Sequence, residues 1–240
     1  MLFVKIIMGC WLAASVISDR QTNVKNVHDA DSTVNSGVSL GNDSGGEKAS
    51  GKPVSVTKSL APFTALALDG AFDVEVQRGA DYRITVNADK KAIECVTINV
   101  ASENLSVGLK KNSNLDGEIK LIIELPVLAR LDFSGAGNIL INDVVGEKLE
   151  IFAEKGAGDF VISGKVKDFT LKINGAVSVD AGKLMVQNAN VDARGSSSAT
   201  VNVQNCLTAN VGGAATVRYC GTPKELKEQT SGTGSLEKIK

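Results

Sequence analysis

The chain has 240 residues, and its 26 Lys and Arg residues nearly balance its 27 Asp and Glu residues, giving a formal net charge of −1. This balance argues against a nucleic-acid-binding protein, which presents a strongly basic face. Hydrophobic residues make up 43% of the chain, which is enough for a sizeable core and too many for a wholly disordered protein. With one histidine, His28, any Ser-His-Asp or Cys-His catalytic site would depend on that single side chain.

Residues 1–18 predict a secretory signal peptide. Lys5 precedes an apolar run of about 12 residues, which is too short to span a hydrocarbon core of about 30 Å. A positive start, a short apolar stretch and a small-residue exit are typical of such signals. Cys10 ends an Ile-Met-Gly-Cys segment similar to a bacterial lipobox, so lipidation of Cys10 is an alternative, as is an uncleaved apolar N-terminus. We expect an extracytoplasmic protein (periplasm, cell envelope or secreted), with peripheral membrane association through the N-terminus as an option.

Residues 19–55 predict a flexible linker. They are rich in Ser, Asn, Asp and Gly, contain no aromatic residue and show no sustained apolar period. His28 lies here, and we expect it to be a solvated linker side chain. The remaining residues, 56–240, are expected to form one domain, with lead-in strands over 56–130 and repeats over 131–240.

Alternation of apolar and polar residues begins at Val54 and predicts short β-strands. A single helical turn is expected from Asp89 to Glu94. The strands are expected at residues 66–68, 72–76, 82–86, 96–100, 105–107 and 119–125.

After Pro126 the chain repeats a unit of small residues followed by an alternating strand, at steps averaging about 19 residues. A segment beginning at Gly70 is similar to an earlier copy. A period near 20 residues with strands and no helices predicts an all-β fold of the β-solenoid type, in which stacked coils share one core. A β-sandwich is the alternative. The repeat corners are expected at Gly135 with Gly137, Gly156 with Gly158, Gly175, Ser197, Gly213 and Gly232.

Four segments carry a resemblance to a known family. They run from Phe63 to Val74, from Leu125 to Leu131, from Ser134 to Ile139 and from Ser231 to Ser235. Over roughly residues 60–240 the chain resembles the DUF2807 family, described as putative auto-transporter adhesin, head GIN domain. The resemblance implies a right-handed parallel β-helix in a bacterial cell-envelope protein. No catalytic residues can be carried over from the family, because none are established in it.

Two glycine-rich corners are similar to ligand-binding motifs. The Gly156 to Phe160 segment is similar to a calcium-binding nonapeptide, but no nine-residue period brings further aspartates to it. The Gly135 to Gly137 segment is similar to a phosphate-binding loop, but no helix follows it. We therefore expect structural corners, with no metal and no cofactor.

The cysteines predict a disulfide rather than a metal site. No Cys-x-x-Cys pair is present. Cys206 and Cys220 follow their expected corners, Ser197 and Gly213, by nine and seven residues, so they are expected near equivalent turns of adjacent coils. Cys206 and Cys220 are therefore candidate disulfide partners, with two unpaired buried thiols as the alternative and Cys95 left over.

These features favour a non-catalytic, adhesin-like binding or structural module whose partner is an envelope or extracellular polymer or protein. The alternative is a polysaccharide lyase or hydrolase that uses paired carboxylates. Glycan-binding surfaces usually present exposed aromatic side chains. After signal removal the chain would have two tyrosines, Tyr82 and Tyr219, and no Trp, which weakens both glycan binding and glycan cleavage as hypotheses. The polar residues 224–240 are expected to cap the last coil. The candidate carboxylates, which form no recognisable stack, are Asp132, Asp143, Asp159, Asp180 and Asp192.

Overall fold

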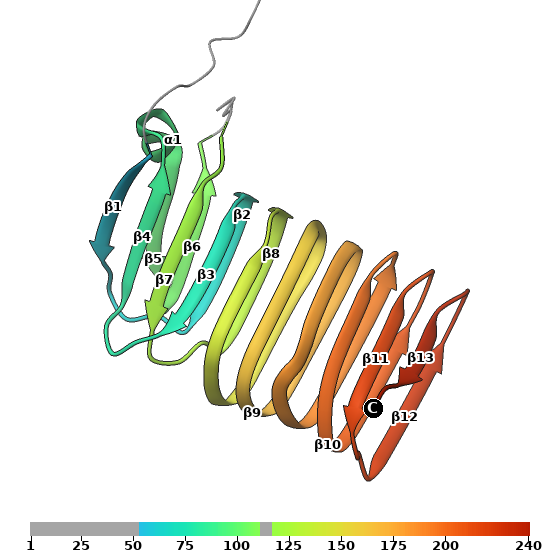
Figure 1. The fold of residues 1–240 in the computed structure, drawn as a ribbon. Helices are drawn as coiled ribbons and strands as arrows, with labels where there is room; N and C mark the ends of the chain where they lie inside the picture. The colour runs from blue at the N-terminus through green and yellow to red at the C-terminus, as the bar shows by residue number, and fades with distance from the viewer. Residues whose placement is uncertain (1–52, 111–116) are drawn as a thin grey trace, which may run out of the picture. The chain divides into compact units, whose positions relative to one another are not determined.

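The computed structural model describes residues 53–110 and 117–240, so the expected signal peptide, Cys10 and His28 lie outside the described residues. The described part is all-β with one short helix, and its 13 strands form one sheet (Figure 1). The prediction of an all-β fold is confirmed. The elements are β1 (Val54–Ser59), β2 (Ala65–Ala71), β3 (Asp73–Arg78), β4 (Arg83–Ala88), α1 (Lys90–Cys95), β5 (Val96–Ala101), β6 (Asn104–Leu109), β7 (Lys120–Leu125), β8 (Arg130–Ala136), β9 (Ile139–Gly195), β10 (Ser198–Val211), β11 (Thr216–Gly221), β12 (Glu225–Thr230) and β13 (Ser235–Lys238).

The sheet is mixed, whereas the family resemblance implied a parallel β-helix. β1 pairs with β4, β4 with β7, and β5 with β6, all antiparallel. The last pair is joined by Ser102 and Glu103, whose φ angles are 50° and 59°. Two consecutive positive φ angles define the hairpin turn that suits the twist of antiparallel strands. Such a turn leaves no room for the crossover connection that parallel strands need.

From β8 onward successive segments pair in parallel. Leu131 of β8 pairs with Ile151 of β9, and Ala199 of β10 pairs with both Val179 of β9 and Val217 of β11. These register steps are 20, 20 and 18 residues, and Figure 1 shows the segments side by side from β8 to β13. Because the alternation is in phase, the apolar side chains of neighbouring segments meet on the same side of the sheet.

Glycines stack where the chain turns between segments. Gly70 pairs with Gly135, and Gly135 with Gly156, so the glycine of the Gly70 segment lies in register with those of two later segments. Gly137 has a φ of +135°, and a Cβ built on it would lie 1.9 Å from the carbonyl oxygen of Phe72. Only glycine fits there, because the two backbones touch and the φ angle disfavours any side chain.

One predicted corner is wrong by two residues. Ser197 was expected at the corner, but a Cβ on Gly195 would contact the Gly175 backbone, and one on Gly213 would contact the Gly195 backbone. Gly195 therefore stacks between Gly175 and Gly213. A shift of two residues preserves the inward and outward alternation, so the apolar pattern alone does not distinguish the two alignments. Ser197 is instead buried, and its Oγ donates to the carbonyl oxygen of Arg194 at 2.8 Å.

The inward side chains form one continuous core, in which Phe133 of β8 and Phe160 of β9 meet edge to face with centroids 5.2 Å apart. The predicted helical turn is confirmed as α1, with Asp89 as its N-cap. No helix among the described residues is long and apolar enough to cross a membrane.

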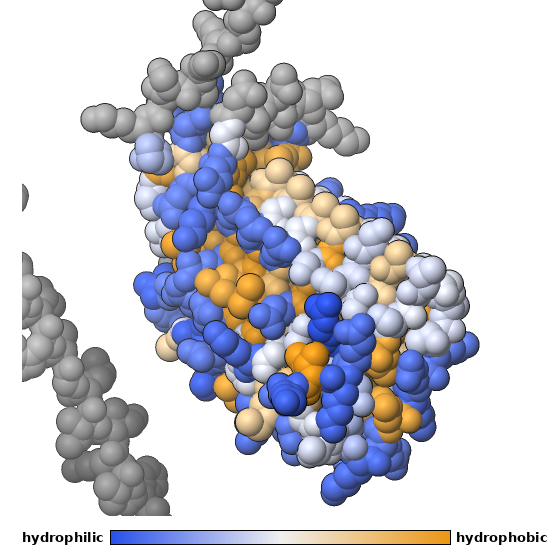
Figure 2. Space-filling model, turned by 45° about the vertical axis from the view of Figure 1, so that its right-hand side comes forward, coloured by the Kyte–Doolittle hydropathy of each residue, from blue (hydrophilic) through white to orange (hydrophobic). Residues whose placement is uncertain are grey.

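On the face shown in Figure 2, apolar residues reach the surface in separate groups among more hydrophilic ones.

Candidate functional site

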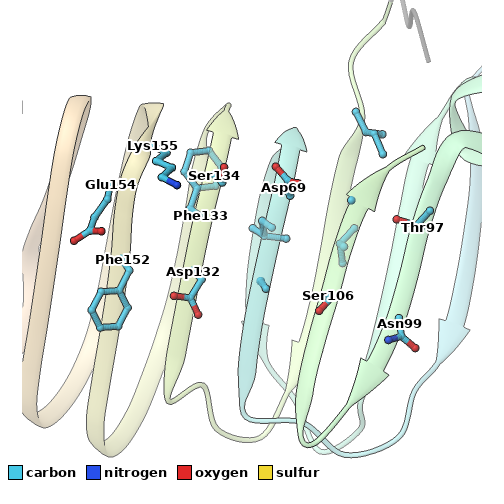
Figure 3. Close-up of a pocket in the computed structure, with 15 residues that line it drawn as sticks. Asp69, Thr97, Asn99, Ser106, Asp132, Phe133, Ser134, Phe152, Glu154 and Lys155 are labelled. Carbon is cyan, nitrogen blue, oxygen red and sulfur yellow. The ribbon is translucent and has the colours of Figure 1, made fainter. Parts of the chain in front are cut away.

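A groove of about 610 Å³ lies on the outer face of the sheet, across β5, β6, β2, β8 and the first part of β9 (Figure 3). Its lining side chains come from the outward-facing positions of these strands and from a few inward-facing ones beneath them. Strands that are distant in the sequence meet here, since β2 pairs with β6 on one side and with β8 on the other. The groove is therefore a product of the sheet topology rather than of any local motif.

One register row crosses the whole groove. Asn99 pairs with Ser106, Ser106 with Ala67, Ala67 with Asp132, and Asp132 with Phe152. Four strand spacings separate the two ends of this row, which is about 19 Å at about 4.8 Å each. Outward side chains of one row stand side by side, so the groove presents an ordered line of amide, hydroxyl, carboxylate and aromatic groups.

The hollow exists because small residues occupy the middle strands. Ala67 and Ser106 stand in the centre of the row just described, and Gly108 stands in the centre of the next row. Larger side chains stand on either side, including Asn99 on β5 and Lys155 on β9. The groove therefore has a floor of small side chains between two rims of larger ones.

Arg130, Asp132 and Phe152 form an ordered cluster at the β9 rim. The Arg130 guanidinium donates from Nε and Nη2 to the two carboxylate oxygens of Asp132, at 2.7 and 2.8 Å. It also lies over the Phe152 ring, 4.4 Å from the centroid, and the Lys172 ammonium lies 5.7 Å from the same centroid. The hydrogen bonds to Asp132 raise the pKa of Arg130, although its partial burial acts in the opposite direction. The cluster holds an ion pair and the Phe152 ring beside the groove, with the Arg130 guanidinium over the ring.

Phe152 is one of the groove residues that the sequence interpretation missed, because only Tyr and Trp were considered as exposed aromatics. The signal was present in the alternation. Leu149, Ile151 and Ala153 are fully buried, so Phe152 occupies an outward position between two inward ones. The alternation of apolar and polar residues therefore predicts that the Phe152 side chain points away from the core.

The candidate carboxylates do not converge. Asp132, Asp143 and Asp192 line three different cavities. Asp180 accepts a hydrogen bond from the Gly182 backbone at 3.0 Å, and Asp159 is exposed at its corner. Among residues 53–110 and 117–240, no three His, Cys, Asp or Glu side chains are placed to hold a metal ion.

The structure does not bring Cys206 and Cys220 together, and both are free thiols, as is Cys95. Cys206 pairs in register with Glu225 of β12, whereas Cys220 pairs with Asn202 of β10. The two cysteines lie on either side of the turn that follows Val203. Counted from the stacked glycines Gly195 and Gly213, their spacings are eleven and seven residues, so the two cysteines fall on different strands of the repeat.

The described domain matches a known family. The model of the DUF2807 family, described as "Putative auto-transporter adhesin, head GIN domain", matches residues 62–223. The match covers more than half of the chain, including all five strands of the groove. The chain belongs to this family. The comparison with curated proteins found no match.

Solved structures share the fold at low sequence identity. A putative adhesin from Bacteroides fragilis has a TM-score of 0.67 and 18% identity, and covers 81% of this chain and 100% of its own. A putative adhesin from Parabacteroides distasonis has a TM-score of 0.56 and 18% identity, covering 79% and 98%. One from Parabacteroides merdae has a TM-score of 0.52 and 18% identity, covering 80% and 98%. At this identity the likeness concerns the fold alone.

Proposed function

We propose that the chain is a non-catalytic, adhesin-like binding module that acts outside the cytoplasm, and that its stacked segments are the coils of a β-solenoid. The register steps of 18 to 20 residues in the parallel ladders support the solenoid description. Membership of a family described as adhesin-like supports an extracytoplasmic binding role. The groove on the outer face is the observation that carries the proposal.

The groove suits an extended, hydroxyl-rich polymer such as an envelope or extracellular polysaccharide. Asn99, Ser106 and Asp132 offer donors and acceptors along one line, and the Phe152 edge offers apolar contact at its end. The lining side chains stand on paired strands, so their positions are fixed before a ligand arrives. An extended ligand would gain from many weak contacts at once, because linked contacts add through effective concentration.

A binding role fits the chemistry of the groove better than hydrolysis does. Both oxygens of Asp132 accept hydrogen bonds from Arg130, so both are already engaged in a bidentate pair. Glycoside hydrolysis requires one carboxyl group to deliver a proton to the leaving oxygen. Asp132 is poorly placed to do so, so a hydrolase would have to use Asp69 and Glu154, which stand on β2 and β9 with β8 between them.

The test uses the purified full chain and a panel of envelope and extracellular polysaccharides. Retention on each polymer is recorded together with the appearance of new reducing ends or unsaturated products. The expected result is retention on at least one polymer without products. Products that disappear in the Asp132→Asn or Asp69→Asn variant would contradict the non-catalytic role. Absence of both retention and products would remove polysaccharides as the ligand class.

A further inference from the structure

Four strands end the sheet, and they differ in how their free edges are protected. Among the described residues, β1, β5, β12 and β13 each pair with one neighbour. Natural sheets protect such edges from pairing with other chains by charged side chains or proline. β1 carries Lys58, β12 carries three charged residues and β13 carries two, but β5, with the sequence Val-Thr-Ile-Asn-Val-Ala, carries none. β5 is the unprotected edge.

The backbone of β5 has groups that point away from β6. The Lys110 amide donates to the Cys95 carbonyl oxygen at 2.9 Å, which places Cys95 at a hydrogen-bonded position of the antiparallel ladder. Hydrogen-bonded positions alternate along such a ladder. Ile98 and Val100 therefore direct their N–H and C=O groups to the free edge, where a further strand would bond to them.

The side chains of β5 match those of a second β5 strand. Val96, Ile98 and Val100 are half-buried against the core, whereas Thr97 and Asn99 are exposed on the outer face. In an antiparallel pair centred on Ile98, Ile98 faces its own copy and Val96 faces Val100, with apolar groups meeting on the core side. Thr97 then faces Asn99 on the outer side. The alternation of both copies is kept, which this pairing requires.

The geometry points to the free edge of β5 as a self-association surface, on which a second copy of this chain adds its own β5 in antiparallel orientation. The resulting interface is two-fold symmetric, with the same patch on both subunits. It contains no charge, so no like charges face each other across the axis. Thr97 and Asn99 also line the groove, and pairing would bring the two grooves together at the axis. The inference concerns the strand edge, and it holds whether or not the groove binds a polymer.

Sedimentation velocity of the full chain gives the first test. A Thr97→Lys and Asn99→Lys double variant places lysines opposite each other across the axis, on outward positions that leave the core unchanged. The matched control is a Ser55→Lys and Thr57→Lys double variant on β1, another end strand with exposed side chains at these positions. We expect a dimer for the wild type and the control, and a monomer for the β5 variant with unchanged far-ultraviolet circular dichroism.

Cross-linking gives a second test that does not depend on the lysine variant folding. Thr97 and Asn99 of the two copies would form a non-hydrogen-bonded pair, with Cα atoms about 4.5 Å apart, which is within disulfide range. A mixture of the Thr97→Cys and Asn99→Cys single variants should therefore form an oxidised dimer more readily than either variant alone, with the wild type as control for the native cysteines. A monomeric wild type, or a dimer that persists in the β5 lysine variant without preferential cross-linking in the mixture, would overturn the inference.

Discussion

At the residue scale, Gly137 tests the stacking of the turns. A Gly137→Ala variant would place a methyl group against the Phe72 carbonyl and force alanine into a φ of +135°. We expect a loss of at least about 2 kcal/mol in the free energy of unfolding, because both the contact and the φ angle are unfavourable. Urea unfolding of the variant and the wild type measures this loss in the free energy of unfolding. Gly146 is the matched control, since its nearest neighbour would lie 3.7 Å from a new Cβ, and Gly146→Ala should change stability by at most about 1 kcal/mol. Equal losses in the two variants would contradict the stacking.

Glu75 makes the stability depend on pH. Its carboxylate accepts a hydrogen bond from Gln77 at 2.7 Å and pairs with Lys120 at 3.3 Å, and these contacts lower its pKa below the ordinary 4.5, although desolvation opposes them. A lowered folded-state pKa stabilises the fold above the unfolded pKa, and this stabilisation is lost as the pH falls through the folded pKa. Glu75→Gln should therefore show a smaller difference between urea midpoints at neutral and acidic pH. Glu147→Gln, at an exposed carboxylate, is the control and should behave as the wild type.

At the element scale, the cap of α1 governs the connection between β4 and β5. Asp89 Oδ1 accepts a hydrogen bond from the Ala92 amide at 2.8 Å, and no acidic residue in the first turn adds to it. Asp89→Ala should lower the free energy of unfolding by about 1 kcal/mol, whereas Asp89→Asn, which keeps an acceptor oxygen, should cost less. Chemical denaturation of both variants measures the difference. An equal loss in both would mean that the cap does not contribute through this hydrogen bond.

The sequence was a good guide to individual elements and a poor one to their register. Alternation located the strands because burial of one face of a sheet imposes a period of two. The same period explains the error at Ser197, since the true corner, Gly195, is two residues away and keeps the same phase. The cysteine pair was misplaced for a related reason, since the position of Cys206 was counted from Ser197 and not from Gly195. The β5–β6 hairpin turn of Ser102 and Glu103 contains neither glycine nor asparagine, so its positive φ angles left no sequence signal.

At the scale of the whole molecule, the groove was beyond the reach of the sequence. Its central row joins Asn99, Ser106, Ala67 and Asp132, whose order across the sheet differs from their order in the chain. No spacing in the sequence predicts that Ala67 lies between Ser106 and Asp132. Phe152 was predictable from its outward phase, but its neighbours were not. The family membership likewise indicates a kind of protein without indicating the residues that bind.

The most direct test of the binding groove is to fill it. Ala67 faces outward from the groove floor, so Ala67→Trp blocks the groove without removing a core side chain or a hydrogen bond. The matched control is Thr200→Trp, at an outward position of β10 outside the groove. On a polymer that retains the wild type, we expect Ala67→Trp to lose retention at least about tenfold, which corresponds to about 1.4 kcal/mol, and Thr200→Trp to keep it. Undiminished retention of a folded Ala67→Trp variant would contradict the assignment of the groove as the binding surface.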